Sequence, residues 1–149
     1  MKTFLLYWNP YFSSYKVEDF LDDFDFEEGI FPDDFNWSIY EHEKAHAGDR
    51  FIFIKVGYEK PTGIIGTGHF TSEPYLGEDW SGQGRKVWYM DMEWETAVDP
   101  LSDMVAPTDA LQAAVPDVNW TTGKAGVEID PKTAFIIEGI WQHHLKKFK

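Results

Sequence analysis

The chain has 149 residues, a formal net charge of −13 and no cysteine. This length suits a single domain over residues 1–149, while the lack of cysteine excludes disulfides, thiolate catalysis and cysteine metal sites and is typical of a reducing compartment. The apolar start ends at Trp8-Asn9-Pro10, too early for a signal peptide, and no run reaches the ~20 apolar residues of a membrane span, so we expect a cytoplasmic protein.

The first predicted elements are a strand and a helix. Residues 4–8 form an apolar run before Pro10, which predicts a buried strand. The spacing of apolar residues predicts a helix over residues 16–23, with Ser13 or Ser14 as its N-cap.

The outer face of that helix and the connection after it are strongly acidic. No Lys or Arg interrupts the run of carboxylates at Glu18, Asp19, Asp22, Asp23, Asp25, Glu27, Glu28, Asp33 and Asp34. Such a surface repels a polyanion through like charge. This matters because nucleic-acid binding gains much of its affinity from phosphate contacts. A long duplex would need another face, near Arg85-Lys86 or Lys124, unless the ligand is small.

The middle of the chain predicts a short helix and then a strand. Ser38 and Glu41 have the spacing of a capping box for a helix over residues 38–47, which Gly48 ends. Residues 50–56 are dense in β-branched and aromatic side chains, so they predict a central strand.

A glycine-rich strand is predicted over residues 64–71. Gly66 and Gly68 weaken its strand propensity and indicate a bulge or a close approach of another group. A flat ligand could lie against these glycines.

The second half of the chain predicts a loop over residues 73–85 and four further elements. These are a strand over 86–96 with a bulge near 90–92, a helix over 108–114, a short strand over 127–129 and a helix that begins after Asp130-Pro131.

The sharpest formal motif is the HExxH pattern at residues 42–46. On a helix, His42 and His46 would share a face and could bind zinc, with Glu43 as the general base of a hydrolase. A metalloprotease motif lies inside a long helix, however, whereas Gly48 ends this one directly after the motif. We therefore expect no metal or cofactor and keep a zinc hydrolase as an alternative.

The order of motifs resembles a known family. The runs FLLYWNP at residues 4–10, SYKVEDF at 14–20, AGDR at 47–50 and GIIGTG at 63–68 are similar to those of the EVE domain, a branch of the PUA-like superfamily. Relatives of that branch include YTH and other modified-base reader domains. The resemblance covers roughly the first hundred residues, and it implies an α+β fold with a curved, mostly antiparallel sheet or small barrel of five or six strands and flanking helices.

The resemblance also implies a ligand site. In that family the pocket lies between the loop after the first strand and the aromatic loop before the short helix. The matching positions here are Trp8, Asn9, Pro10, Asn36, Trp37, Ser38 and Ile39.

These positions would have distinct roles. Trp37 would stack on a base, because a base outside a duplex offers a π-face and a polar edge. Asn9 or Asn36 would bond the base edge, and main-chain groups of Ser38 and Ile39 would orient it. For a methylated base, the second wall of an aromatic cage would come from Trp80 or Trp120. As structural alternatives, Trp8 belongs to the core and Trp37 packs beside a helix start.

We therefore expect a protein without catalytic activity that recognises a modified nucleobase in DNA or RNA, or a small nucleoside-like ligand, with or without an effector protein as partner. An enzyme alternative is a hydrolase of the related ASCH type, which acts on modified nucleosides. Lys55 and Thr67 lie on the strands that would line its pocket. A third alternative is an acidic module that binds a basic protein, with the aromatic residues serving only as core.

Overall fold

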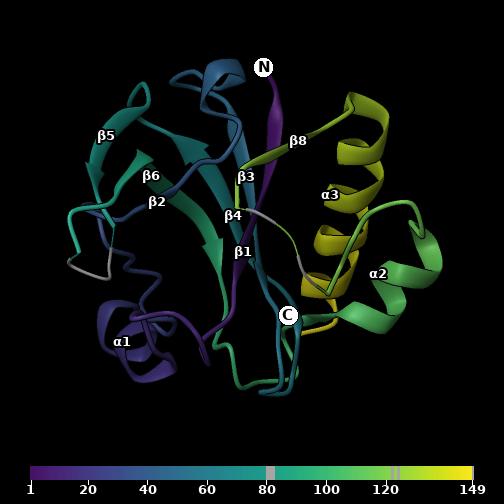
Figure 1. Ribbon diagram of the computed structural model, residues 1–149. Helices are drawn as coiled ribbons and strands as arrows, with labels where there is room; N and C mark the ends of the chain where they lie inside the picture. Colours follow the sequence, from purple (N-terminus) through teal and green to yellow (C-terminus); the bar gives the residue numbers. More distant parts are fainter. Residues whose placement is uncertain (80–82, 122, 124, 149) are drawn as a thin grey trace.

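The computed structural model describes residues 1–79, 83–121, 123 and 125–148, which form a curled sheet with helices packed around it (Figure 1). The strands of the described residues are β1 (Thr3–Trp8), β2 (Asn36–Ser38), β3 (Arg50–Lys55), β4 (Gly63–Phe70), β5 (Tyr75–Glu78), β6 (Lys86–Ala97), β7 (Ala106–Pro107) and β8 (Val127–Ile129). The helices are α1 (Val17–Asp23), α2 (Thr108–Ala114) and α3 (Pro131–Lys146), with a 3-10 turn η1 (His42–Lys44). No described helix has the length and apolar character needed to cross a membrane.

The strand order in the sheet is β2-β6-β4-β3-β1-β8, with β5 also paired to β6 and β7 to β4. β1 and β3 run parallel, and the other pairings between the described strands are antiparallel. The predicted α+β fold with a curved, mostly antiparallel sheet is therefore confirmed. Strands β1, β3, β4, β6 and β8 were predicted. Strands β2, β5 and β7 were not, and β5 replaces part of the loop predicted over residues 73–85.

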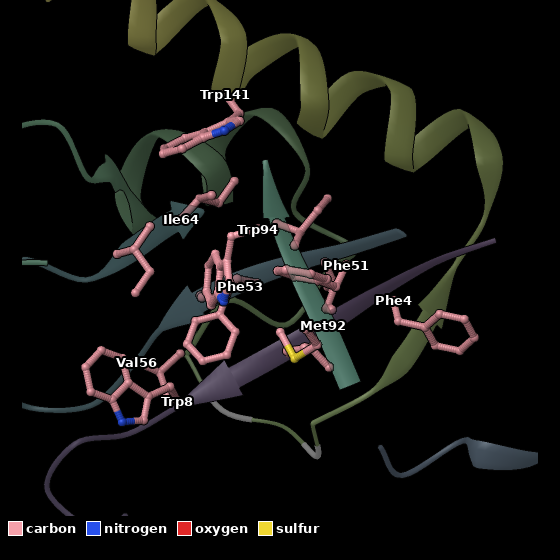
Figure 2. Packing of buried hydrophobic residues seen from close by; sticks show 14 of the residues in the cluster. Phe4, Trp8, Phe51, Phe53, Val56, Ile64, Met92, Trp94 and Trp141 are labelled. Carbon is pink, nitrogen blue, oxygen red and sulfur yellow. The ribbon is translucent and has the colours of Figure 1, made fainter. Parts of the chain in front are cut away.

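A core of aromatic rings lies between the inner face of the sheet and Phe20 of α1. Figure 2 shows the part of it around Trp94, Phe51 and Phe53. Trp94 of β6 lies at its centre, with Phe51 and Phe53 of β3 at ring-centroid distances of 5.0 and 5.1 Å. Phe24 and Phe35 meet the same indole edge-on at 5.0 and 5.2 Å. Edge-to-face contacts suit the opposed charges of ring edge and ring face, so this cluster also orients its members.

The outer face of the sheet is covered by α2 and α3. Trp141 of α3 is fully buried, and its Nε1 donates a hydrogen bond of 3.0 Å to Thr96 Oγ1 of β6. The predicted start of α3 is confirmed, because Asp130 Oδ1 accepts a hydrogen bond from Thr133 N at 2.9 Å. An N-cap carboxylate satisfies a backbone donor that the helix cannot satisfy itself.

The predicted cap of α1 was wrong. The N-cap is Lys16, whose backbone N–H donates a hydrogen bond of 2.8 Å to the Asp19 carboxylate. Ser13 Oγ instead accepts a hydrogen bond from Tyr15 N at 3.0 Å, so its side chain serves the preceding turn. The helix over residues 108–114 is present as predicted.

The helix predicted over residues 38–47 was also wrong. Residues 36–38 pair with β6 as strand β2, and only residues 42–44 form a 3-10 turn. Between them, Tyr40 N and Glu41 N donate to Ala125 O and Gly126 O at 2.7 and 3.0 Å. Pairing with β6 also includes Ile39 N–H, so the backbone is extended where the predicted helix would have had its first turn.

The glycines of β4 are close to other groups, as predicted, but those groups are part of the protein. A Cβ on Gly68 would lie 2.1 Å from Glu93 O, and a Cβ on Gly66 would lie 2.5 Å from the Trp94 ring. The space expected for a flat ligand is therefore filled by β6. Register shifts occur between Phe53 and Ile54 and between Thr67 and Gly68. The second lies opposite Trp94 to Thr96 of β6, so the predicted position of a bulge at residues 90–92 was wrong.

Candidate functional site

The candidate site is the seam between β1 and β2, where Trp37 meets the edge of β1. β8 pairs with β1 only over Thr3 to Leu5, and Gly126 N extends this contact with a hydrogen bond of 2.7 Å to Leu5 O. Beyond that point the edge of β1 faces Trp37, whose Nε1 donates to Tyr7 O at 3.3 Å. The seam is thus the place where the two sides of the curled sheet come together.

The ring of Trp37 is held firmly but is only half-buried. It lies parallel to Phe35 at 6.0 Å and 9°, and it meets Phe53 edge-on at 5.0 Å and 73°. Tyr15 contacts it edge-on at 6.0 Å. Together with the Nε1 hydrogen bond, these contacts define the plane of the indole while part of the side chain stays accessible.

The neighbours of Trp37 in β2 point the other way. Side chains alternate along a strand, so Asn36 and Ser38 lie on the opposite face from Trp37. Asn36 is exposed and Ser38 is half-buried, and they pair with Asp91 and Tyr89 of β6. The structure therefore places the Asn36 amide on the face of β2 opposite the Trp37 indole.

Ile39 and the loop after β1 have structural partners. Ile39 is 2% exposed and its N–H donates to Trp88 O at 2.9 Å. Asn9 is half-buried, and its Oδ1 accepts from Tyr11 N at 3.1 Å. Pro10 is buried next to it. Asn9 Oδ1 thus stabilises the turn that follows β1, at the end of the strand that borders the seam.

Two of the predicted tryptophans lie in the core. Trp8 is fully buried, its Nε1 donates to Tyr15 O at 2.8 Å, and its ring stacks on Phe20 at 5.4 Å. Trp120 is 1% exposed, and its Nε1 donates to Val115 O at 3.0 Å. Neither indole offers a free face in this arrangement. Trp80 lies outside the described residues.

Tyr7 is a residue that the sequence did not single out. Its hydroxyl donates to Asn119 O at 2.7 Å, and burial raises the pKa of this phenol. Its side chain lines a cleft of about 360 Å³ on the outer face, next to the seam. The other described lining residues are Leu5, Asp117, Val118, Asn119, Gly123, Val127, Glu128, Ile129, Asp130 and Thr133. Alternation with Leu5 in β1 was the available signal, because it places both residues on the face opposite the aromatic core.

The HExxH residues do not have the geometry of a zinc site. They lie on and after a 3-10 turn, and the His42 ring stacks on Trp88 at 4.3 Å and 10°. His46 Nδ1 instead lies 2.8 Å from Glu73 Oε1. No group of three or more metal-ligating side chains occurs within the described part of the chain.

The candidate hydrolase residues are also committed to packing. Lys55 is fully buried, and its Nζ donates to Pro61 O and Pro100 O at 3.1 and 3.2 Å. Burial lowers the pKa of Lys55. Thr67 is 1% exposed and shares a hydrogen bond of 2.7 Å with Thr96 Oγ1. These polar atoms link loops and strands.

Comparison with known proteins identifies the fold. No protein-family model matches the sequence, and no curated protein matches it. Among solved structures, the Mmi1 YTH domain in complex with RNA is similar at a TM-score of 0.56 and 10% identity, over 98% of this chain and 80% of that one.

Two further solved structures are similar over nearly their whole length. A hypothetical protein from Leishmania major has a TM-score of 0.55 and 12% identity, over 96% of each chain. A protein from Pseudomonas syringae has a TM-score of 0.56 and 12% identity, over 93% of this chain and 99% of that one. At these identities the likeness concerns the fold, and the chain has a fold similar to that of YTH domains.

Proposed function

We propose that this chain binds RNA or DNA as a reader domain and recognises a single, modified nucleobase at the seam. The position of Trp37 carries the proposal, because it combines a defined ring plane with partial exposure at the edge of the sheet. The likeness to a YTH domain solved with RNA supports nucleic acid as the ligand. The motif order described above supports a place among the EVE and PUA-like domains.

The seam also supplies backbone groups for a base edge. Both backbone polar groups of a strand residue point to the same side, so the N–H of Tyr7 faces the seam together with its carbonyl. A base that stacks on Trp37 would reach this edge of β1. Stacking on one aromatic ring contributes roughly 1–3 kcal/mol, and an edge contact adds the discrimination between bases.

The charge of the chain restricts the form of the ligand. With a net charge of −13, binding cannot depend on many phosphate contacts. We therefore infer that the ligand is a base in a single strand, or one turned out of a duplex. The role is one of binding without catalysis, which agrees with the packing of Lys55 and Thr67.

The test is calorimetric titration and thermal unfolding with modified and unmodified nucleosides and with short single-stranded RNA and DNA. A ligand at ~100 times its Kd should stabilise the fold by about 2.7 kcal/mol. Trp37→Ala should weaken binding roughly tenfold or more, since it removes the stacking surface. Trp88→Ala is the matched control, because Trp88 is also half-buried but stacks on His42.

Two outcomes would contradict the proposal. If a folded Trp37→Ala variant binds as the parent does, the seam is not the base site. If no nucleoside or oligonucleotide binds the parent chain at low or physiological salt, the proposed function is wrong.

A further inference from the structure

Three exposed aromatic rings gather at the end of the molecule where β1 leaves the sheet. Tyr11 and Phe12, in the loop after β1, are 61% and 63% exposed, and Tyr58, in the β3–β4 turn, is 79% exposed. The Tyr11 ring meets Phe12 edge-on at 4.9 Å and Tyr58 edge-on at 5.9 Å. A cluster of large exposed aromatic side chains marks an interaction site more often than an isolated one does.

The two loops that carry these rings are well braced. Asn9 O accepts hydrogen bonds from Phe12 N and Ser13 N at 3.1 and 3.0 Å. Gly57 packs so closely on the Asn9 side chain that a Cβ would lie 2.5 Å from Oδ1. Lys16 Nζ donates to Pro10 O and Tyr11 O at 2.9 and 3.3 Å. The ring cluster is therefore held in place and connected directly to the start of α1.

The adjoining face of α1 is acidic and exposed. Glu18 and Asp22 are four residues apart, so their side chains are neighbours on one face of the helix. Of the nearby cations, Lys16 is engaged by the two loop carbonyls through Nζ, and Lys60 lies two residues after Tyr58 in the β3–β4 turn. Lys16 thus links the loop that carries Tyr11 to the acidic start of α1. We call the exposed residues of the two loops and of α1 the aromatic-acidic surface: Tyr11, Phe12, Tyr58, Glu18, Asp19 and Asp22.

We propose that the aromatic-acidic surface binds an arginine-rich segment of a protein partner. A guanidinium group stacks on an aromatic face and also pairs with a carboxylate, so it uses both components of the surface. All three side chains are well exposed, so they offer surface for such stacking. The surface shares no residue with the seam.

The charge of the surface distinguishes this occupant from a nucleic-acid strand. Single-stranded nucleic acids also stack on exposed aromatic rings, but their sites combine those rings with positive charge. Here the charged side chains of α1 are all carboxylates, which attract a basic peptide and repel phosphates.

The test uses a fluorescein-labelled synthetic peptide of alternating arginine and serine, measured by fluorescence anisotropy at physiological salt. Peptides with lysine or glutamate in place of arginine are compared with it. The parent chain should bind the arginine peptide more tightly than the lysine peptide, since lysine lacks the planar stacking group. The double variant Tyr11→Ala and Tyr58→Ala should raise the Kd roughly tenfold.

Matched variants separate the surface from general attraction. Tyr11→Phe with Tyr58→Phe should retain binding, and Phe135→Ala, at an 82% exposed ring of α3, should leave the Kd unchanged. Glu18→Gln with Asp22→Asn should weaken binding severalfold. Glu43→Gln with Asp109→Asn removes the same charge elsewhere and should have a much smaller effect.

Three outcomes would overturn the proposal. The first is equal weakening by the two charge pairs, which would mean that only the net charge attracts the peptide. The second is no binding of the arginine peptide by the folded parent chain. The third concerns a fluorescein-labelled oligouridine measured in the same assay. If the tyrosine-to-alanine variant loses oligouridine binding and keeps peptide binding, the surface is a nucleic-acid site.

Discussion

At the scale of single residues, Glu41 determines how the chain continues after Trp37. Its Oε1 accepts a hydrogen bond from Glu128 N at 2.6 Å, and its Oε2 lies 3.0 Å from Lys44 Nζ. Its own N–H donates to Gly126 O at 3.0 Å. This carboxylate therefore holds the segment beyond β2 against β8 and keeps the seam closed on that side.

The first prediction concerns the pH dependence of this contact. The Glu128 N–H lowers the pKa of Glu41 from its usual value of 4.5. Because the folded pKa is depressed, the stabilisation is complete above pH about 4.5 and is lost as the pH falls through the folded pKa. Glu41→Gln should lower the free energy of unfolding by about 1–2 kcal/mol at neutral pH, and by less in acid.

Urea unfolding of the parent and Glu41→Gln between neutral and acidic pH measures this difference. Glu43→Gln is the control, since its side chain is 88% exposed. A stability difference that stays constant with pH would contradict the assigned role of the Glu41 charge.

The second prediction contrasts two glycines. Gly68→Ala should destabilise the fold by about 2–3 kcal/mol, because its Cβ would lie 2.1 Å from the main-chain oxygen of Glu93. Gly139→Ala, in the middle of α3, meets nothing within 4 Å and should stabilise by about 0.5–1 kcal/mol through helix propensity. Denaturant titration of both variants checks the pair, and a neutral Gly68→Ala would show that β6 can shift.

At the scale of elements, α3 is held against the sheet by its buried side chains, Ala134, Ile137 and Trp141, and by an ionic contact of Glu138. Trp141 lies against the outer face and bonds Thr96, as described above. Arg50 of β3 reaches Glu138 of α3 at 2.8 Å and Glu95 of β6 at 2.7 Å. These contacts therefore connect the helix to two strands, β3 and β6.

The third prediction tests this docking. Trp141→Phe removes buried ring atoms and leaves Thr96 without its donor, so it should cost about 2–3 kcal/mol of unfolding free energy. Phe135→Ala, on the exposed face of the same helix, should change that free energy by less than about 0.5 kcal/mol. Equal losses in the two variants would mean that α3 is stabilised by its own propensity and not by docking.

At the scale of the whole molecule, the charge of −13 is unevenly distributed. The carboxylates of α1 and the connection after it repel one another, and the described ion pairs lie largely in other elements. Repulsion between exposed charges is screened by salt over a distance of ~10 Å at 0.1 M ionic strength.

The fourth prediction follows from that repulsion. Raising NaCl from about 0.01 to about 0.3 M should increase the free energy of unfolding by roughly 1 kcal/mol. The reason is that salt weakens the repulsion among the carboxylates more than it weakens the ion pairs. Asp22→Asn should reduce this gain. A urea midpoint that falls with added NaCl would instead show that the attractive pairs of Arg50 dominate.

Local patterns in the sequence were sufficient to predict the elements that are specified by apolar spacing or by capping residues within the segment itself. The apolar runs of β1 and β3, the glycine-marked β4 and the capped start of α3 all follow from neighbouring residues. The family resemblance added the curved sheet and directed attention to Trp37. These features depend on backbone propensity and side-chain periodicity, which a short segment carries within itself.

Only the tertiary structure decided the fate of residues 36–47 and of the individual tryptophans. Residues 36–39 pair with β6 and so keep an extended backbone, which replaces the start of a locally plausible helix with a strand, and only a 3-10 turn follows. Trp8 and Trp37 have the same chemistry and similar settings in the sequence, yet one ring is fully enclosed and the other reaches the seam. That difference depends on which distant elements close over each ring, and no local pattern specifies it.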